Sequence, residues 1–166
     1  MRYNLLYLSP LMCHLNAFLT LLAVVLSLGT ARAQATKTLT GRLLDDQLET
    51  VPMANIYAPD TTVIGKTDME GYFKLDITRN PNTLLFGAVG LELTTVKLSE
   101  ECTHLEVILL LSSSYDFMSV RRVNRKESKR FKHLPQLHQE AYEKGLFKSR
   151  TPCAFPIFTK WVPRSP

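Results

Sequence analysis

Cysteine is scarce in this sequence, and its spacing argues against a metal or redox centre. The 166 residues include Cys13, Cys102 and Cys153, and no two of them form a Cys-x-x-Cys pair. Zinc sites and thiol redox centres are typically built on that spacing, so we predict neither. Cys102 and Cys153 would remain after N-terminal processing. They can bridge in an oxidising compartment, and the sequence leaves open whether they do.

The sequence also lacks the patterns of common enzyme sites. Its seven glycines form no phosphate-binding loop, and no Ser or Cys lies in a nucleophile motif. His133 and His138 are five residues apart, which is off one helical face. Asp68 and Glu70 alternate as in a calcium loop, but residues 71–74 add no carboxylate. We therefore expect a non-enzymatic protein with no catalytic, cofactor-binding or metal-binding residue and no cofactor.

A single long apolar run is present, and it lies near the N-terminus. Leu15–Gly29 follows one formal charge, Arg2, and precedes Ala31-Arg32-Ala33, which fits the A-x-A cleavage pattern. The run is short for a membrane span, and no cysteine lies at the cleavage point. We expect residues 1–33 to be a cleaved signal peptide, with a retained anchor as the alternative. The mature chain would have no transmembrane segment. It would be exported to the periplasm or outer membrane, or secreted.

Residues 38–111 are predicted to form short β-strands. In Tyr72–Ile77, three apolar residues alternate with three polar or exposed ones, which is the period of a strand with one buried face. Turn-forming residues separate similar segments at intervals typical of a β-sandwich. The seven predicted strands are Thr38–Leu44, Ala54–Ala58, Val63–Thr67, Tyr72–Ile77, Thr83–Gly90, Leu93–Ser99 and His104–Leu111.

The C-terminal third differs in charge and in predicted structure. Residues 34–115 carry six Lys/Arg against eleven Asp/Glu, whereas residues 116–166 carry twelve against four. Residues 115–147 are helix-prone, and Pro135 and Gly145 are placed as the first helical position and the residue past the end of one helix. Residues 148–166, rich in proline and aromatics, form either an irregular ordered tail or a flexible one.

The run Arg121–Lys132 holds seven basic residues and one acid. It is either a solvated helix face, or a contact with an anionic surface or with the acidic sandwich itself. Nucleic acid is not expected as a partner of an exported chain. The candidate partner contacts are Arg121, Arg122, Arg125, Lys126, Lys129 and Arg130.

Several motifs in residues 38–111 match those of one family. They are the spacing G-x-x-x-D, the pattern T-D-x-x-G-x-F and a later Val-Gly pair, and the residues concerned are Gly41, Asp45, Pro52, Ala54, Asn55, Ile56, Thr67, Asp68, Gly71, Phe73, Leu84, Phe86, Val89 and Gly90. Together they resemble the carboxypeptidase-regulatory-like domain, in its free-standing exported bacterial form. One departure is the segment FGAVGLE, which is less aromatic than the family's pattern.

The resemblance implies a mainly β fold: a seven-stranded transthyretin (prealbumin)-like, Ig-like sandwich over residues 34–114, followed here by the basic helical extension. It supplies no catalytic residue, and within it Asp68 and Gly71 are expected to form a turn. We predict a module that binds a protein or an anionic component of the cell envelope. The alternative is a small carbohydrate- or peptide-binding protein of outer-membrane nutrient uptake, using Tyr57, Tyr72 or Trp161. The oligomeric state stays open.

Overall fold

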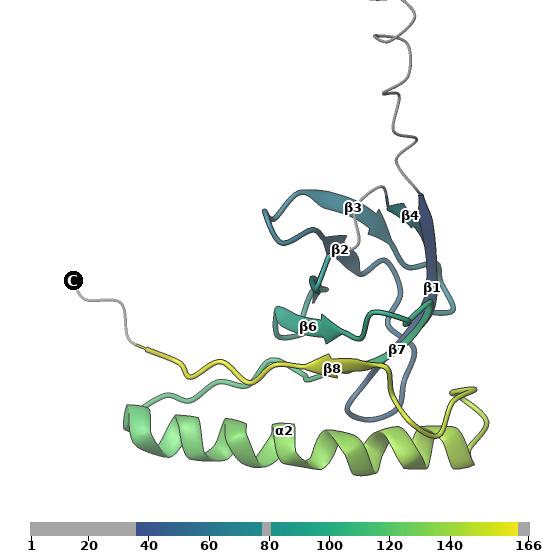
Figure 1. The fold of residues 1–166 in the computed structure, drawn as a ribbon. Helices are drawn as coiled ribbons and strands as arrows, with labels where there is room; N and C mark the ends of the chain where they lie inside the picture. Colours follow the sequence, from purple (N-terminus) through teal and green to yellow (C-terminus); the bar gives the residue numbers. More distant parts are fainter. Residues whose placement is uncertain (1–35, 78–80, 163–166) are drawn as a thin grey trace, which may run out of the picture. The chain divides into compact units, whose positions relative to one another are not determined.

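A computed structural model describes residues 36–77 and 81–162 (Figure 1). The predicted signal peptide lies outside the described residues. Eight strands and one helix occur within these ranges, and they are β1 Lys37–Asp45, β2 Asn55–Tyr57, β3 Val63–Lys66, β4 Tyr72–Ile77, β5 Thr83–Gly87, β6 Thr94–Leu98, β7 His104–Leu109, α2 Val120–Glu143 and β8 Ala154–Pro156.

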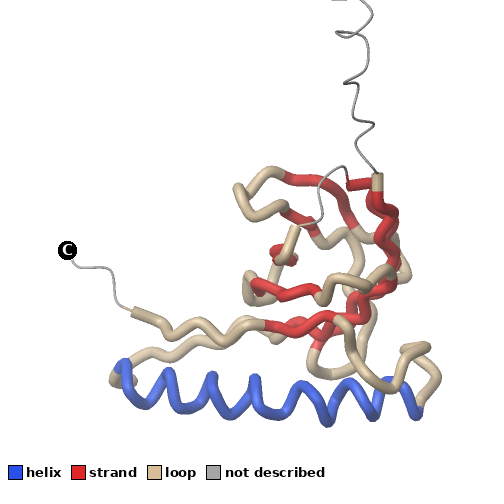
Figure 2. The backbone as a smooth tube through the Cα atoms, viewed as in Figure 1, coloured by secondary structure: helices blue, strands red, loops and turns tan. Residues whose placement is uncertain are grey.

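The strands form two sheets, as predicted for a β-sandwich (Figure 2). One has the order β4-β1-β7 and the other β3-β2-β5-β6-β8. β1 pairs with β7 in parallel, and the other pairings are antiparallel. The alternation in β4 buries Phe73, Leu75 and Ile77 in a core shared by both sheets. The mainly β fold with a C-terminal helix is therefore confirmed.

The second sheet ends in a strand that the sequence did not reveal. β8 comes from the predicted tail and pairs with β6, so that Ala154 lies opposite Leu98 and Pro156 opposite Val96. Proline is tolerated there because β8 is the edge strand of its sheet. Cys102 and Cys153 form a disulfide immediately before β8, with their Cα atoms 5.6 Å apart. The structure thus contains the bridge that the sequence leaves open.

Helix α2 packs against the outer face of the three-stranded sheet where β1 and β7 end. Leu44 and Ile108, which alternate with residues of the main core, form a second apolar cluster with Leu134, Ala141 and others of the C-terminal segment. The predicted helix end is correct, and Gly145 follows it with φ 72°. The predicted start at Pro135 is wrong, because Pro135 lies inside α2. Proline forfeits one helical hydrogen bond, and the burial of Leu134 and of its neighbours in α2 offsets that cost.

Helix α2 is too polar to cross a membrane, and no helix within the described ranges meets the length and apolarity that a span requires.

Candidate functional site

The T-D-x-x-G-x-F motif forms the turn between β3 and β4, as predicted. One carboxylate oxygen of Asp68 accepts hydrogen bonds from the backbone N–H groups of Glu70 and Tyr72, at 3.0 and 2.7 Å. Gly71 has φ 79°, and a Cβ there would lie 2.6 Å from the carbonyl oxygen of Leu43. The hydroxyl of Thr67 donates to the Val51 carbonyl and accepts from the Ala54 N–H. Each of these residues therefore has a structural role.

The other motif residues also serve the scaffold. Asp45 accepts hydrogen bonds from the N–H groups of Gln47 and Glu49, both at 2.9 Å, and so closes the turn after β1. Gly41 lets the Phe73 ring and the β7 backbone approach β1, because a Cβ would lie 2.1 Å from the Leu105 carbonyl oxygen. Four others lie before or at the start of β2 or in a loop: Pro52 is exposed, Ala54 is fully buried, Asn55 begins β2, and Gly90 has φ 80°.

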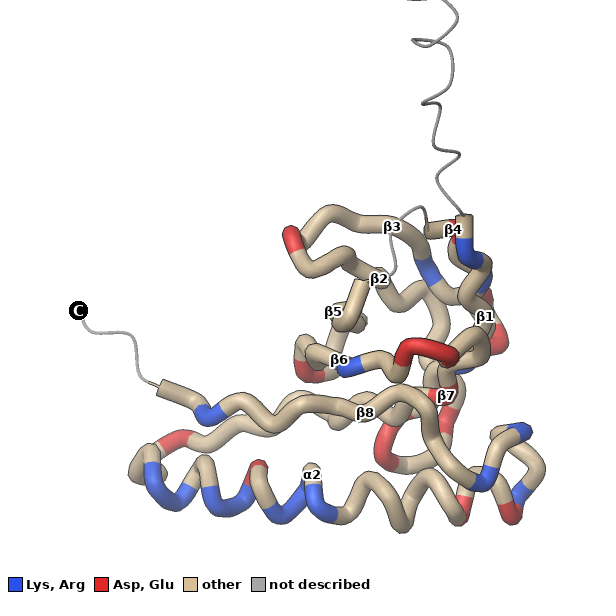
Figure 3. Tube along the Cα trace, in the orientation of Figure 1, with Lys and Arg blue, Asp and Glu red and all other residues tan. Residues whose placement is uncertain are grey.

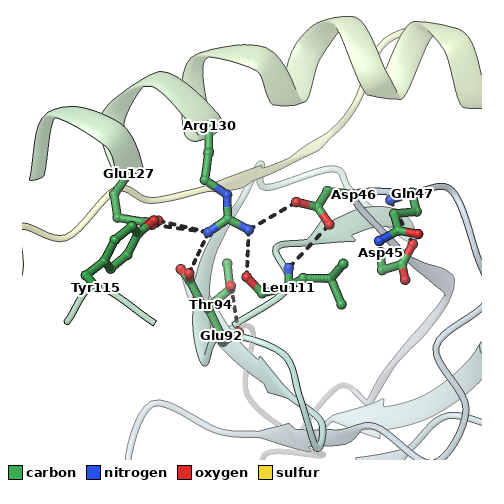
Figure 4. Close-up of polar contacts among 9 residues, drawn as sticks. All are labelled: Asp45, Asp46, Gln47, Glu92, Thr94, Leu111, Tyr115, Glu127 and Arg130. Atoms are coloured by element: carbon green, nitrogen blue, oxygen red, sulfur yellow. Dashed lines mark hydrogen bonds and ion pairs between the residues drawn. The ribbon is translucent and has the colours of Figure 1, made fainter. Parts of the chain in front are cut away.

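Arg130 ties α2 to the acidic sandwich (Figure 4). Its guanidinium lies 2.8 Å from Glu92, 3.1 Å from Asp46 and 3.1 Å from Glu127, and it donates to the Leu111 carbonyl at 2.6 Å. Tyr115 donates to the same Glu127 carboxylate. The Arg130 side chain is only 22% exposed. Of the six candidate partner contacts, Arg130 is therefore engaged inside the molecule.

The titration of this cluster follows from its burial. Burial, followed by the nearby charge of Glu127, raises the pKa of Glu92 in spite of Arg130. Burial alone would lower the pKa of Arg130, but the hydrogen bonds and charges of Asp46, Glu127 and Glu92 outweigh it, and the net shift is upward. Three carboxylates thus share one guanidinium at the junction of helix and sandwich. Sequence reasoning missed Asp46 and Glu92, because they lie 84 and 38 residues from Arg130.

The other five candidate contacts lie on the opposite, exposed face of α2. Arg121, Arg122, Arg125, Lys126 and Lys129 are all exposed, and so is Lys132 in the next turn. The side chains that α2 buries in this half are Val123 and Glu127, and Glu127 is the only acid between residues 121 and 132. Figure 3 shows the resulting concentration of positive charge along the N-terminal half of α2. Within the described ranges, Arg130 alone of these basic residues forms an ion pair.

Comparison with known proteins identifies the scaffold. Residues 39–120 match the family model described as the CarboxypepD_reg-like domain. This segment is a CarboxypepD_reg-like domain. Domains of this family are Ig-like β-sandwiches, in agreement with the two sheets described above. The predicted resemblance is confirmed.

Two other comparisons add little to the CarboxypepD_reg-like assignment. A chain in the cryo-EM structure of the E. coli P pilus tip assembly intermediate PapC-PapD-PapK-PapG has 17% sequence identity and a TM-score of 0.37. The similarity covers 50% of this chain and 10% of that one, and it is too slight to bear on function. A comparison with curated proteins finds no match.

A cleft lies where the C-terminal tail passes between α2 and the CarboxypepD_reg-like domain. Its volume is about 1320 Å³, and its walls include Leu93, Tyr115, Phe158 and Trp161. The Asn124 side chain holds the tail by two hydrogen bonds with the Trp161 backbone, at 2.7 and 3.0 Å. This pairing could not be predicted from the sequence, because an isolated asparagine forms no recognisable pattern.

The three aromatics suggested for ligand binding are therefore separated. Trp161 lines the cleft and is 52% exposed. Tyr72 lies on β4, where the Arg42 guanidinium stacks 4.8 Å from its ring centre, and Tyr57 is half-buried on β2. In the part of the chain that the structure describes, no group of three or more His, Cys, Asp or Glu side chains could hold a metal ion.

Proposed function

We propose that this protein is a non-enzymatic, exported CarboxypepD_reg-like module that docks on an anionic component of the cell envelope through the exposed basic face of α2. The observation that carries the proposal is the split within the basic run. Arg130 is engaged with the sandwich, whereas Arg121, Arg122, Arg125, Lys126 and Lys129 face solvent. A helix face with this many cations and no acid attracts anions and accelerates their association.

The attachment of α2 makes this face a rigid one. Val123, Leu134 and Ala141 are buried, and Arg130 fixes the helix near its middle. Residues 121, 125, 129 and 132 recur at helical spacing, so their side chains lie along one stripe. Cations that are already aligned lose less conformational freedom on binding than those of a flexible tail.

Export is supported by the Cys102–Cys153 disulfide, because such bonds persist in oxidising compartments. Cell fractionation combined with crosslinking tests this part of the proposal. We expect the protein in the envelope or the external fraction, crosslinked to an envelope component. Recovery from the cytoplasm with both cysteines reduced would contradict export.

Charge reversal tests the docking face. We expect Arg125→Glu/Lys129→Glu to lose most binding to isolated envelopes in a sedimentation assay, at least tenfold in affinity. Lys66→Glu/Lys74→Glu is the matched control, since it makes the same charge change on exposed residues of β3 and β4. Binding of the parent should also weaken as salt is raised. Equal loss in both double variants, or binding that salt leaves unchanged, would refute docking through α2.

The cleft supports a second candidate function, the binding of a small carbohydrate or peptide. Tyr115, Phe158 and Trp161 line it and supply aromatic surface on which sugar rings or apolar side chains can pack. Glycan arrays and peptide libraries test this candidate, with Trp161→Ala as the variant that should lose binding. If neither screen yields a ligand, the second candidate falls.

A further inference from the structure

Beside the basic face lies a group of exposed apolar side chains that neither the fold nor the proposed docking explains. Phe117 is fully exposed at the tip of the turn Tyr115–Met118, where the Met118 N–H donates to the Tyr115 carbonyl at 3.2 Å. Its φ is 61°, a left-handed conformation that is costly for a bulky residue. Trp161 and Val162 in the tail are 52% and 74% exposed.

These side chains flank the start of the basic helix face. Phe117 precedes the first residue of α2 by three positions, and the next residues of the helix are Arg121 and Arg122. On the other side, Asn124 binds the backbone of Trp161, so Trp161 lies beside the first turns of α2, and Arg121 is a neighbour of Asn124 at i,i+3 spacing. The tail also carries the exposed Lys160. Cations and apolar side chains therefore share one end of the molecule.

We propose that the anionic partner is a lipid surface, which the cations of α2 bind through lipid phosphates and into which Phe117 and Trp161 insert. This inference rests on the proposed function and names its partner. A soluble polyanion would need only the cations, and it would leave a strained, fully exposed phenylalanine without a role. At a membrane surface, aromatic side chains enter the boundary between headgroups and acyl chains while cations remain at the phosphates.

The architecture fits insertion by a loop and a tail rather than by the helix itself. An interfacial helix binds lipid with its own apolar face. In α2 that face is buried against the sandwich, with Leu134 and Ala141 in the second apolar cluster. Any apolar contact with lipid must therefore come from beside the helix, and Phe117 and Trp161 are exposed there.

The sequence provides its own reporter, because Trp161 is the only tryptophan. The test uses residues 34–166, which contain the whole compact unit 35–166. Vesicles of phosphatidylglycerol and phosphatidylethanolamine should shift Trp161 emission to the blue, and brominated acyl chains should quench it. Phosphatidylcholine vesicles should produce neither effect. In co-sedimentation, Phe117→Ala and Trp161→Ala should each weaken binding by about tenfold, as expected for withdrawing one large apolar side chain from lipid.

Two further variants separate the contribution of the aromatic side chains from that of the cations. Met69→Ala removes a side chain that is 66% exposed in the β3–β4 turn, and should leave vesicle binding unchanged. The β3–β4 turn is on the side of the C-terminal end of α2, away from the basic face in the N-terminal half. It precedes Tyr72, which stacks on Arg42, and Arg42 donates a hydrogen bond to the Leu146 carbonyl just after α2. Arg125→Glu/Lys129→Glu should abolish vesicle binding, because the cations bring the aromatics to the surface.

The outcomes distinguish this inference from the proposed function. If inorganic polyphosphate or an envelope protein binds the parent but anionic vesicles do not, the lipid inference fails and anionic docking stands. If vesicles bind without quenching by brominated chains, or Phe117→Ala and Trp161→Ala bind like the parent, insertion is overturned. If neither vesicles, polyphosphate nor envelopes bind, the proposed function fails as well.

Discussion

Asp68 and Gly71 shape the turn between β3 and β4, in which one carboxylate oxygen of Asp68 accepts hydrogen bonds from two backbone N–H groups. Gly71→Ala should lower the free energy of unfolding by more than about 1 kcal/mol, because the added Cβ meets the Leu43 carbonyl in a left-handed conformation. Urea denaturation measures the change. Gly90→Ala is the control, since Gly90 has φ 80° but no atom within 4 Å of the added Cβ. Equal losses would show that the close approach to Leu43 costs nothing.

Arg130 compensates three carboxylates, so its removal should be far more damaging than that of its exposed neighbours. Arg130→Met should destabilise the protein by about 2–4 kcal/mol at pH 7, because Asp46, Glu92 and Glu127 would keep their charges without a cation. Arg125→Met, at an exposed position of the same helix, should change stability by less than about 0.5 kcal/mol.

The pH dependence gives Arg130→Met a second signature. The folded-state pKa of Glu92 is already raised, so its ionisation costs stability as pH rises through that pKa. Without Arg130, the ionisation of Glu92 costs more stability, because the cation that favours its charged form is gone. The deficit of Arg130→Met should therefore be smallest at acid pH, where Glu92 is protonated, and should grow as pH rises through the raised folded-state pKa of Glu92. A deficit that is constant from pH 4 to pH 7 would assign the loss to packing.

At the scale of single elements, the sequence predicted what local pattern determines. The alternation in β4 and the turn chemistry of Asp68 and Gly71 are local, and they located seven strands. The sequence did not predict β8, because three residues that end in Pro156 have no strand pattern. β8 is held in place by its pairing with β6 and by the disulfide of Cys153. The start of α2 was misplaced because proline usually begins a helix, whereas long-range burial carries α2 through Pro135.

The basic run of the candidate docking face could be predicted because it is a local sequence pattern. Which of its residues face the sandwich and which face solvent could not be predicted. A run of basic residues at helical spacing is visible in the sequence, and it indicated the six candidate contacts. Which of them faces the sandwich depends on contacts 38 and 84 residues away, with Glu92 and Asp46. The pairing of Asn124 with Trp161, separated by 37 residues, is equally nonlocal.

The C-terminal half of α2 holds a buried histidine that should make stability depend on pH. Burial lowers the pKa of His138 below its ordinary value of 6.5, against a hydrogen bond to the Ser149 carbonyl and the nearby charge of Glu106. The folded protein therefore binds this proton less readily than the unfolded chain. The stability that neutral His138 contributes to the folded state is fully present above pH 6.5. It is lost as pH falls from 6.5 through the lowered folded-state pKa of His138.

We expect the melting temperature to fall between pH 7.5 and pH 5, and His138→Gln to show a smaller fall. Glutamine can still donate to Ser149 but cannot be protonated in this range. His133→Gln, at an exposed position of α2, should keep the parental profile. Circular dichroism melts at several pH values measure the effect. A His138→Gln profile identical to that of the parent would exclude His138 as its cause.

At the scale of the whole molecule, acids and bases are concentrated in different layers, and Arg130 forms ion pairs between them. The sandwich carries an excess of acids and the N-terminal half of α2 an excess of bases, yet only Arg130, among the basic residues in the run 121–132, pairs with sandwich acids in the described ranges. The remaining cations face away. The charge split of the sequence is thus not neutralised within the fold, and it leaves α2 as a surface suited to an anionic partner.

The disulfide connects stability to that surface. Within the tail, Cys153 is followed by β8, which pairs with β6, and Trp161 then binds Asn124, so one covalent bond anchors the segment that positions Trp161. Cys102→Ala/Cys153→Ala should destabilise the protein by about 4 kcal/mol, the chain-entropy value for a separation of 51 residues. It should also weaken binding to anionic vesicles, because a released tail no longer holds Trp161 beside α2.

Asn124→Ala distinguishes the two effects, since it removes both hydrogen bonds to Trp161 and leaves the disulfide intact. We expect this variant to lose vesicle affinity with a stability loss of about 1–2 kcal/mol, well below that of the cysteine variant. Co-sedimentation and urea denaturation report the two quantities separately. If the cysteine variant loses stability but binds vesicles like the parent, the tail's position does not matter for docking, and the aromatic contribution belongs to Phe117 alone.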